Sequence, residues 1–198
     1  MSRISIRYAR PEFETHVNKL LHSLHIVPKN PDLYTLACVH RSVLNEVTDG
    51  YNESNERLEY LGDAVLELVI TEALFHEFPE KPEGELTDIR SALVRGRNLA
   101  EVARHLHFSD AIQVSRGEFN AKGHENPYIL ANALEAVIGA LYIDYGFERA
   151  QEFIMLHIFS TLPHILEKSL FVDPKSALQE LTQEVWGVTP VYQVVEEV

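Results

Sequence analysis

The spacing of apolar residues predicts an all-α main domain. Apolar residues recur at helical intervals through most of the 198-residue chain, and strand-like alternation is clear only in Val188 to Val195. The composition is that of an ordinary globular protein, with 45% hydrophobic and 24% charged residues. The sequence therefore predicts one helical core followed by a short tail.

Seven helices are expected in the core, and each follows a run of apolar residues at helical spacing. They cover residues 11–24, 33–44, 56–78, 86–94, 97–106, 127–145 and 148–166. The helix over 127–145 is the best delimited, because Asn126 is a suitable N-cap, Pro127 favours the first helical position and Gly146 favours the end. Residues 117–127 (GEFNAKGHENP) are rich in turn formers and predict a loop.

A change in composition at residues 171–174 (FVDP) marks the best domain boundary. Residues 175–185 then form an amphipathic pattern that predicts one helix, and a β-rich segment follows Trp186 and Gly187. The 26 residues from 173 to 198 are too few to enclose a core. We therefore expect a main domain over residues 1–170 and, over 171–198, the opening of a second domain that is cut short.

The charge and cysteine content of the chain limit which binding partners and which cellular compartment are expected. The chain has 30 acidic and 17 basic residues, and its formal charge of −13 argues, taken alone, against polyanion binding. Its single cysteine, Cys38, cannot form an intrachain disulfide, so a reducing cytoplasm is expected. Acidic or amide residues interrupt the longest apolar runs before they reach the roughly 20 residues of a membrane span, so no membrane partner is expected.

Three acids near the start of the helix over 56–78 could converge on one point. Glu56, Glu59 and Asp63 fall within an arc of about 60° at 3.6 residues per turn. Spacing alone favours the ordinary interpretation, a solvated acidic face. Beyond Asp63, however, the helix is nearly all apolar, which predicts a central position where acids need a cation or a partner. Gly62 costs about 1 kcal/mol relative to alanine inside a helix, which indicates that another element packs close to it.

The helix over 127–145 is the candidate partner. Small residues at helical spacing would let another backbone approach: Ala133, Ala136, Gly139 and Ala140. Asn132 and Glu135 stand on the same, otherwise apolar helix, and a buried Glu135 is explained if it meets the acids of the first helix around a divalent metal. Clustered carboxylate and amide oxygens suit Mg²⁺ or Mn²⁺ rather than zinc, which favours phosphoryl chemistry. The pair His105 and His107 lacks a third ligand and does not change this view.

These residues resemble a known family. The segment NERLEYLGDAVL (55–66) is similar to the signature of ribonuclease III, the metal-dependent endonuclease of double-stranded RNA. Further matching segments follow in uninterrupted order over roughly residues 12–166: His40-Arg41-Ser42, Asn45-Glu46, Phe78-Pro79, Glu83 to Thr87, Leu93-Val94, Gly117-Glu118 and ILANALEAVIGALYID at 129–144. The resemblance implies the helical endonuclease fold of that family.

Carried over position by position, the resemblance implies that Glu59, Asp63 and Glu135 are the metal-binding catalytic carboxylates and that Glu56 supports them. Glu83 matches an acidic position that contributes to the family's metal or subunit site. At Asn132 the family commonly has aspartate, and a carboxamide offers a neutral oxygen ligand instead. We therefore expect an active enzyme with weaker metal affinity, in which Asn132 acts directly or through water.

The resemblance further implies hydrolysis of double-stranded RNA that leaves a 5′-phosphate and a 3′-hydroxyl, in the processing of rRNA and mRNA precursors. Family members are homodimers in which each subunit cuts one strand and the product has short 3′ overhangs. The residues themselves only permit a dimer, through apolar side chains near Leu61, Leu66 or Leu86 if these are exposed. The segment DPKSALQEL (173–181) with TPVY (189–192) is similar to the first helix and first strand of a double-stranded RNA-binding domain.

Within the main domain one short stretch is basic. It contains Arg90, Arg95, Arg97 and Arg104 against Asp88 and Glu101, and we take Arg95 and Arg97 as candidate RNA contacts. Salt bridges to neighbouring helices explain the stretch equally well. Two other functions remain open for the chain as a whole. One is a catalytically weak or silent relative that binds double-stranded RNA, and Asn132 is its only support; the other is an acidic interaction module whose acids are separately solvated.

Overall fold

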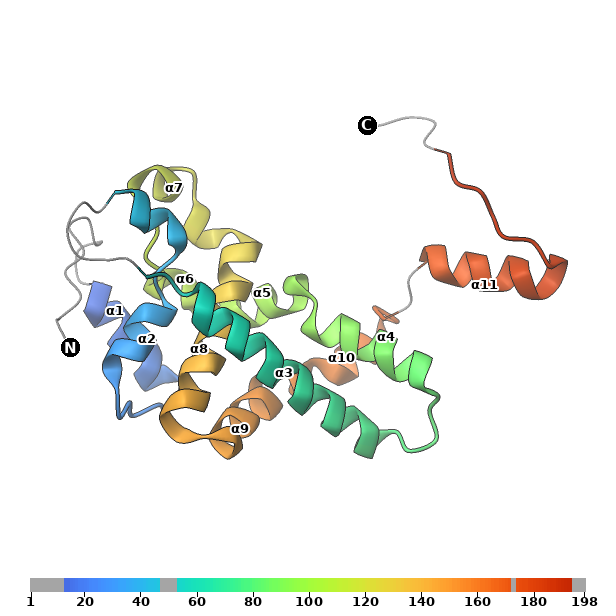
Figure 1. The fold of residues 1–198 in the computed structure, drawn as a ribbon, viewed down its shortest axis with the longest axis horizontal. Helices are drawn as coiled ribbons and strands as arrows, with labels where there is room; N and C mark the ends of the chain where they lie inside the picture. The colour runs from blue at the N-terminus through green and yellow to red at the C-terminus, as the bar shows by residue number, and fades with distance from the viewer. Residues whose placement is uncertain (1–12, 47–52, 172–173, 194–198) are drawn as a thin grey trace.

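The computed structural model describes residues 13–46, 53–171 and 174–193, and the described part is helical (Figure 1). The α-helices are α1 (Phe13–Ser23), α2 (Pro31–Ala37), α3 (Glu56–Glu77), α4 (Glu83–Val94), α5 (Gly96–His105), α6 (Phe108–Ala111), α7 (Arg116–Asn120), α8 (Pro127–Tyr145), α9 (Phe147–His157), α10 (Leu162–Glu167) and α11 (Pro174–Trp186). Three 3₁₀ helices connect them: η1 (Arg41–Asn45), η2 (Gly123–Glu125) and η3 (Phe159–Thr161). The all-α prediction for the main domain is confirmed.

Helix α8 is the centre of the core. Its sequence is apolar almost all round, and its buried side chains include Leu130, Leu134 and Ile138. A helix that is apolar on every face has to be surrounded. Helices α2, α3, α5 and α9 pack around α8, and the α3–α8 contact is the most extensive of all (Figure 1).

Two glycines allow α3 and α8 to touch backbone to backbone. A Cβ atom added at Gly62 of α3 would lie 1.8 Å from the carbonyl oxygen of Glu135, and one added at Gly139 of α8 would lie 2.2 Å from the carbonyl oxygen of Leu58. The expectation that an element packs against Gly62 is therefore confirmed. The element is α8, and the small-residue seam around Gly139 is where it makes contact.

The helix expected over residues 33–44 is two separate elements, so that prediction was wrong. Helix α2 ends at Ala37, because the chain then turns to pair with a distant segment. Val39 forms an isolated parallel bridge with Gln113, the amide of His40 donates to the carbonyl of Gln113 at 2.9 Å, and the amide of Gln113 donates to the carbonyl of Cys38 at 2.8 Å. The chain resumes as the 3₁₀ helix η1 at Arg41.

The helix expected over residues 148–166 is also interrupted. Helix α9 ends at His157, and α10 begins at Leu162 after the 3₁₀ turn η3. Pro163 occupies the start of α10. Proline has no amide hydrogen to donate and its ring obstructs the preceding turn, so a continuous helix through this position is unfavourable.

The segment expected to be a loop at 117–127 contains two short helical elements, α7 and η2. The hydroxyl of Ser115 accepts from the amide of Glu118 at 3.1 Å and so caps α7. The segment packs tightly at Gly123, where an added Cβ would meet the side chain of Glu118 at 2.3 Å. Short helices with side-chain caps tolerate the glycine and asparagine that made this segment look like a loop.

Helix α11 confirms the helix expected over residues 175–185 and lies apart from the main body in Figure 1. Residues 187–193 do not form the strand expected to begin at Val188; residues 194–198 lie outside the described part. A strand needs a neighbour to satisfy its backbone groups, and no sheet is present in the described ranges. The assignment of residues 171–198 to an RNA-binding domain stays a prediction.

In residues 13–46, 53–171 and 174–193, which the structure describes, no helix combines the length and apolar character required to span a bilayer.

We predict that Gly62→Ala destabilises the protein. Alanine favours a helix by about 1 kcal/mol over glycine, but its methyl group would overlap the Glu135 carbonyl and force the two helices apart at a cost of about 3 kcal/mol, so we expect a net loss of about 2 kcal/mol. The measurement is urea unfolding followed by circular dichroism.

Gly84→Ala is the matched control, because it lies in the first turn of α4 and an added Cβ there meets nothing within 4 Å. We expect it to leave stability unchanged or raise it by up to about 1 kcal/mol. Equal effects of the two substitutions would contradict the proposed importance of the contact.

Candidate active site

The first turn of α3 is fixed to the segment that follows α2. Asn55 is buried, its backbone amide donates to the carbonyl of Val39 at 2.9 Å, and its side-chain amide donates to the carbonyl of Ala37 at 3.3 Å. The hydroxyl of Ser54 accepts from the amide of Glu56 at 3.4 Å and donates to the Glu56 carboxylate at 2.9 Å. These hydrogen bonds fix the position of the first turn of α3 and therefore of the acids that it carries.

The α3–α8 contact brings together four of the residues singled out in the sequence. Glu59 and Asp63 come from α3, Asn132 and Glu135 from α8, and we call Glu59, Asp63 and Glu135 the acidic cluster. A hydrogen bond between the side chains of Asn132 and Glu59 crosses the helix pair. All four positions lie within a few residues of Gly62 or Gly139, where the two backbones touch.

Burial and neighbouring charges raise the pKa of two members of the acidic cluster, Glu135 and Glu59. Burial, and then the charges of Asp63, Glu59 and Glu67, raise the pKa of Glu135 to about 8. Burial and the neighbouring Glu56 also raise the pKa of Glu59, and the hydrogen bond from Asn132 opposes that shift. Carboxylates that resist ionisation because other carboxylates are close are stabilised by a cation.

The donors fit a hard divalent cation. Three carboxylates and an amide oxygen are the ligand types that Mg²⁺ and Mn²⁺ prefer. In the ranges described, no three His, Cys, Asp or Glu side chains stand close enough together to hold a metal ion. The two helices thus bring these donors near enough to act on one another electrostatically, and the side chains would have to move closer together to coordinate one ion.

Glu56 lies at the edge of the acidic cluster and is paired with an arginine. The guanidinium of Arg41 lies 3.6 Å from its carboxylate, and both side chains are largely exposed. Arg41 belongs to η1, which is held by a hydrogen bond from the amide of Ser115 to the hydroxyl of Ser42 at 2.9 Å. The positive charge of Arg41 also lowers the pKa of Glu59.

Glu83 does not join the others within one chain. It is the first residue of α4, beyond the C-terminal end of α3, and the part of α3 between Asp63 and Glu77 spans roughly 20 Å. There Glu83 lines a pocket of about 420 Å³ with Phe75, Lys81 and Arg90 among others. Its assignment to the metal or subunit site stays a prediction.

Sequence reasoning missed one acid that acts on this site. The charge of Glu67 contributes to the raised pKa of Glu135. The signal was available, because Glu67 lies eleven residues after Glu56 and returns to within about 20° of the same helix face. Its carboxylate is 3.2 Å from the guanidinium of Arg90.

The two candidate RNA contacts lie on another part of the surface. Arg95 and Arg97 line a pocket of about 280 Å³ with His164 and Lys168 of α10 and its C-terminal end. The Arg97 side chain is 86% exposed and lies 3.6 Å from Glu101, one turn later on α5. An exposed pair of this kind contributes little to stability, so Arg97 is available to another partner.

Comparison with known proteins identifies the family. The model of the ribonuclease-III-like family matches residues 30–162. The chain is 44% identical to ribonuclease 3 of Treponema denticola over 166 residues, which cover 84% of this chain and 67% of the relative. It is 43% identical to ribonuclease 3 of Campylobacter jejuni, over 91% of this chain and 78% of the relative. This chain belongs to the ribonuclease III family.

Solved structures agree with the ribonuclease III fold. The nuclease domain of ribonuclease III from Campylobacter jejuni, described for flexibility in a region involved in dimer formation, matches with a TM-score of 0.68 and 41% identity, covering 74% of this chain and 99% of that one. The fold also resembles Dicer from Pichia stipitis, with a TM-score of 0.52 and 24% identity. The ribonuclease III chain is thus an endoribonuclease, and α3 and α8 carry its candidate active site.

We predict that Glu135→Gln changes how the stability of this ribonuclease III chain depends on pH. A carboxyl whose pKa rises from 4.5 to about 8 on folding stabilises the fold at low pH, and that contribution is lost as the pH rises through about 8. Glutamine cannot ionise and avoids the loss. The measurements are made in EDTA. Between about pH 5 and about pH 9, we expect the free energy of unfolding of the variant, relative to that of the parent, to rise by about 2 kcal/mol, a value that allows for the partial exposure of the Glu135 carboxyl.

The measurement is urea unfolding of both proteins across this pH range. Because the two proteins share all other titrating groups, the contributions of those groups cancel when one free energy of unfolding is subtracted from the other. Saturating Mg²⁺ should raise the stability of the parent chain more than that of the variant. Parallel pH curves for the two proteins in EDTA would contradict the raised pKa of Glu135.

Proposed function

We propose that this endoribonuclease cleaves double-stranded RNA by metal-dependent hydrolysis of phosphodiester bonds, leaving 5′-phosphate and 3′-hydroxyl ends. The observation that carries the proposal is the meeting of Glu59, Asp63, Asn132 and Glu135 across the α3–α8 contact. Separately solvated acids would not shift one another's pKa, so an acidic interaction module does not account for this arrangement.

The residues that would hold Mg²⁺, or Mn²⁺ in its place, are Glu59, Asp63 and Glu135, with Asn132 as a neutral oxygen donor. Glu56, at the edge of the acidic cluster, would assist these ligands. Glu83 would contribute an acid to a metal or subunit site. The bound cation would neutralise charge on the phosphate and make water more acidic. The chain itself would contribute the oxygen donors and, in Glu135, a carboxyl with a pKa raised to about 8 that would have to release its proton to bind the cation.

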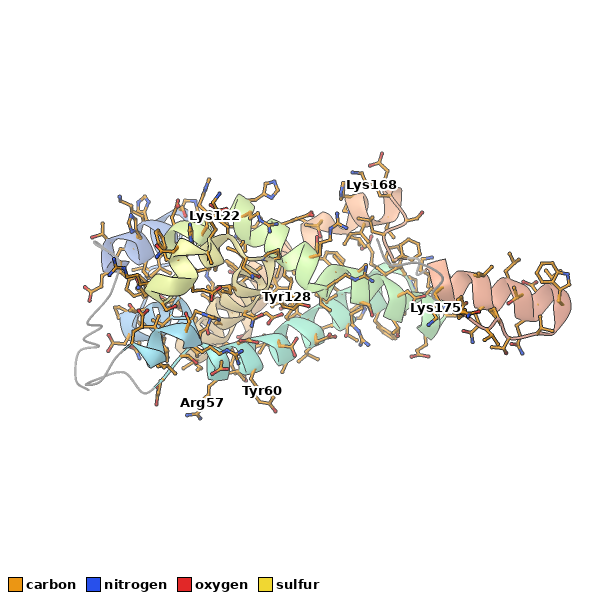
Figure 2. All side chains as sticks on the ribbon, turned by 90° about the horizontal axis from the view of Figure 1, so that it is seen from above. Arg57, Tyr60, Lys122, Tyr128, Lys168 and Lys175 are labelled. Atoms are coloured by element: carbon orange, nitrogen blue, oxygen red, sulfur yellow. The ribbon has the colours of Figure 1, made fainter. Side chains whose placement is uncertain are left out.

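We place the catalytic unit in a homodimer. Exposed apolar side chains on α3 support this assignment, because Tyr60 is 81%, Phe75 66% and Leu68 57% exposed. In Figure 2, Tyr60 points away from the helical body. Leu66, one of the residues considered for the interface, is fully buried, and that part of the prediction was wrong. The proposed face is Tyr60, Leu68 and Phe75, with Leu61 and Leu86 half-buried.

We infer that its cellular substrates are structured RNA precursors, rRNA and mRNA, in a reducing cytoplasm. The single cysteine, Cys38, is buried, which is compatible with a reducing compartment. A second candidate function is a weakly active or silent protein that binds double-stranded RNA. Only Asn132 favours it, since a neutral ligand in place of the family's common aspartate lowers the affinity for a cation.

We predict that the chain cleaves duplex RNA in Mg²⁺ and not in EDTA, and that Glu135→Ala lowers the rate at least about 100-fold while RNA binding is retained. Loss of one oxygen donor from the cluster disables the metal site without touching a basic surface. The assay compares cleavage with binding of the same duplex, the latter measured in Ca²⁺ to prevent turnover.

The matched control is Glu14→Ala, an exposed acid in the first turn of α1 and outside the acidic cluster. It should cleave at the parent rate. Undiminished cleavage by Glu135→Ala would remove Glu135 from the mechanism, whereas binding without cleavage by the parent chain would favour the silent relative.

We predict that Arg95→Ala and Arg97→Ala weaken RNA binding without altering sequence preference. Each phosphate contact removed should reduce the slope of log affinity against log salt by about 1. Binding is measured over a series of salt concentrations, with Arg149→Ala of α9 as the control, because Arg149 is already held by Glu152 at 2.7 Å. An unchanged slope in both variants would make the basic stretch structural.

A further inference from the structure

Arg90 and Glu67 form a tightly held pair between α4 and α3. The Arg90 Nε atom is 3.2 Å from the Glu67 carboxylate, and the Arg90 side chain also donates to the Thr71 hydroxyl at 3.1 Å. Thr71 in turn donates to the backbone carbonyl of Glu67 at 2.6 Å. The arginine is therefore held at two points, by an acid and by a hydroxyl one turn further along α3.

This pair stands at one end of a row of acids on α3. Along the helix the row runs Glu56, Glu59, Asp63, Glu67, and these positions share one face. Arg41 pairs with the first acid and Arg90 with the last. The two acids in the middle, Glu59 and Asp63, have no arginine or lysine partner within ion-pair distance in the described ranges.

Glu67 lies near enough to the acidic cluster for its charge to matter. It follows Asp63 by four residues on α3, and side chains at this spacing are neighbours on one face of a helix. An unpaired Glu67 would therefore add a further negative charge beside the cluster. Its pairing with Arg90, and the partial burial of both side chains, reduces that contribution.

We propose that Arg90 is a positioning residue that holds Glu67 out of the cation site and cancels its charge, so that a divalent cation is confined to Glu59, Asp63, Asn132 and Glu135. This inference rests on the proposed function, because it concerns the cation site of the acidic cluster. It differs from a role in RNA contact, for which an arginine should be free to reach a phosphate. Arg90 is already bound to Glu67 and Thr71.

The experiment measures Mn²⁺ binding to the full chain without RNA, by titration calorimetry and by the electron paramagnetic resonance signal of free Mn²⁺. Removing the arginine alone, in Arg90→Gln, leaves Glu67 as an unpaired negative charge, and Mn²⁺ should bind about three- to tenfold more tightly. Removing the acid alone, in Glu67→Gln, leaves an unpaired positive charge, and binding should weaken by a similar factor. The double variant should bind within about twofold of the parent chain.

Charge cancellation predicts that Mn²⁺ affinity rises in Arg90→Gln and falls in Glu67→Gln. Damage to the fold would instead lower the affinity in both variants. Arg90→Lys keeps the charge and should stay close to the parent. Arg149→Gln of α9 removes an arginine from a comparable pair with Glu152 and should leave Mn²⁺ binding unchanged.

The inference is overturned if both single variants bind Mn²⁺ like the parent chain, or if both bind it more weakly. It is equally overturned if Arg90→Gln leaves Mn²⁺ binding unchanged but, in a separate RNA titration like that for Arg95 and Arg97, lowers the salt dependence of RNA binding, which would make Arg90 a phosphate contact. Failure of the parent chain itself to bind Mn²⁺ would remove the proposed metal site, and the inference with it. If the parent chain binds Mn²⁺ and substitutions at Arg90 and Glu67 do not change that binding, the role of Arg90 is contradicted, and the proposed metal site still stands.

Discussion

The backbone contact between α3 and α8 is the constraint on which the rest of the molecule depends. Ordinary helix pairs are separated by about 8–10 Å because side chains lie between them. Here Gly62 meets the carbonyl of Glu135, and Gly139 meets the carbonyl of Leu58. Side chains that flank these glycines therefore face each other at short range from two rigid helices. The same contact closes the core around α8 and places the oxygen donors of Glu59, Asp63, Asn132 and Glu135 together.

Concentrating acids in this way has an electrostatic cost, and several features reduce it. Glu56 and Glu59 lie in the first turn of α3, where the helix dipole favours negative charge. Asn132 contributes a neutral donor, Arg41 and Arg90 pair with the outer acids, and the raised pKa of Glu135 favours its protonated, uncharged form. The net charge of −13 is thus a poor guide to partners, because several of these acids form one site whose charge a cation would neutralise.

The sequence predicted those parts of the structure that local chemistry determines. The bounds of α8 follow from Asn126, Pro127 and Gly146, and the shared face of the α3 acids follows from helix geometry. Gly62 indicated the close approach, although only the fold shows that Gly139 completes it. Other features depend on residues far apart in the chain. Helix α2 ends early because Val39 pairs with Gln113, and the burial of Leu66 is set by the packing of α3. The shared helix face of Glu67 could be read from the sequence, but only the fold shows that its charge acts on Glu135.

A site carried by two helices in backbone contact has no hinge. Loops can open and close on their own, but the spacing between the backbones that carry Glu59 and Glu135 changes only if α3 leaves α8, and that step exposes the centre of the core. The lifetime of the assembled site is therefore the lifetime of the fold. Amide protons of α3 and α8 around Gly62 and Gly139 should be among the slowest in the chain to exchange with solvent. Ageing or heating of the protein should then remove catalytic competence and core structure in one step.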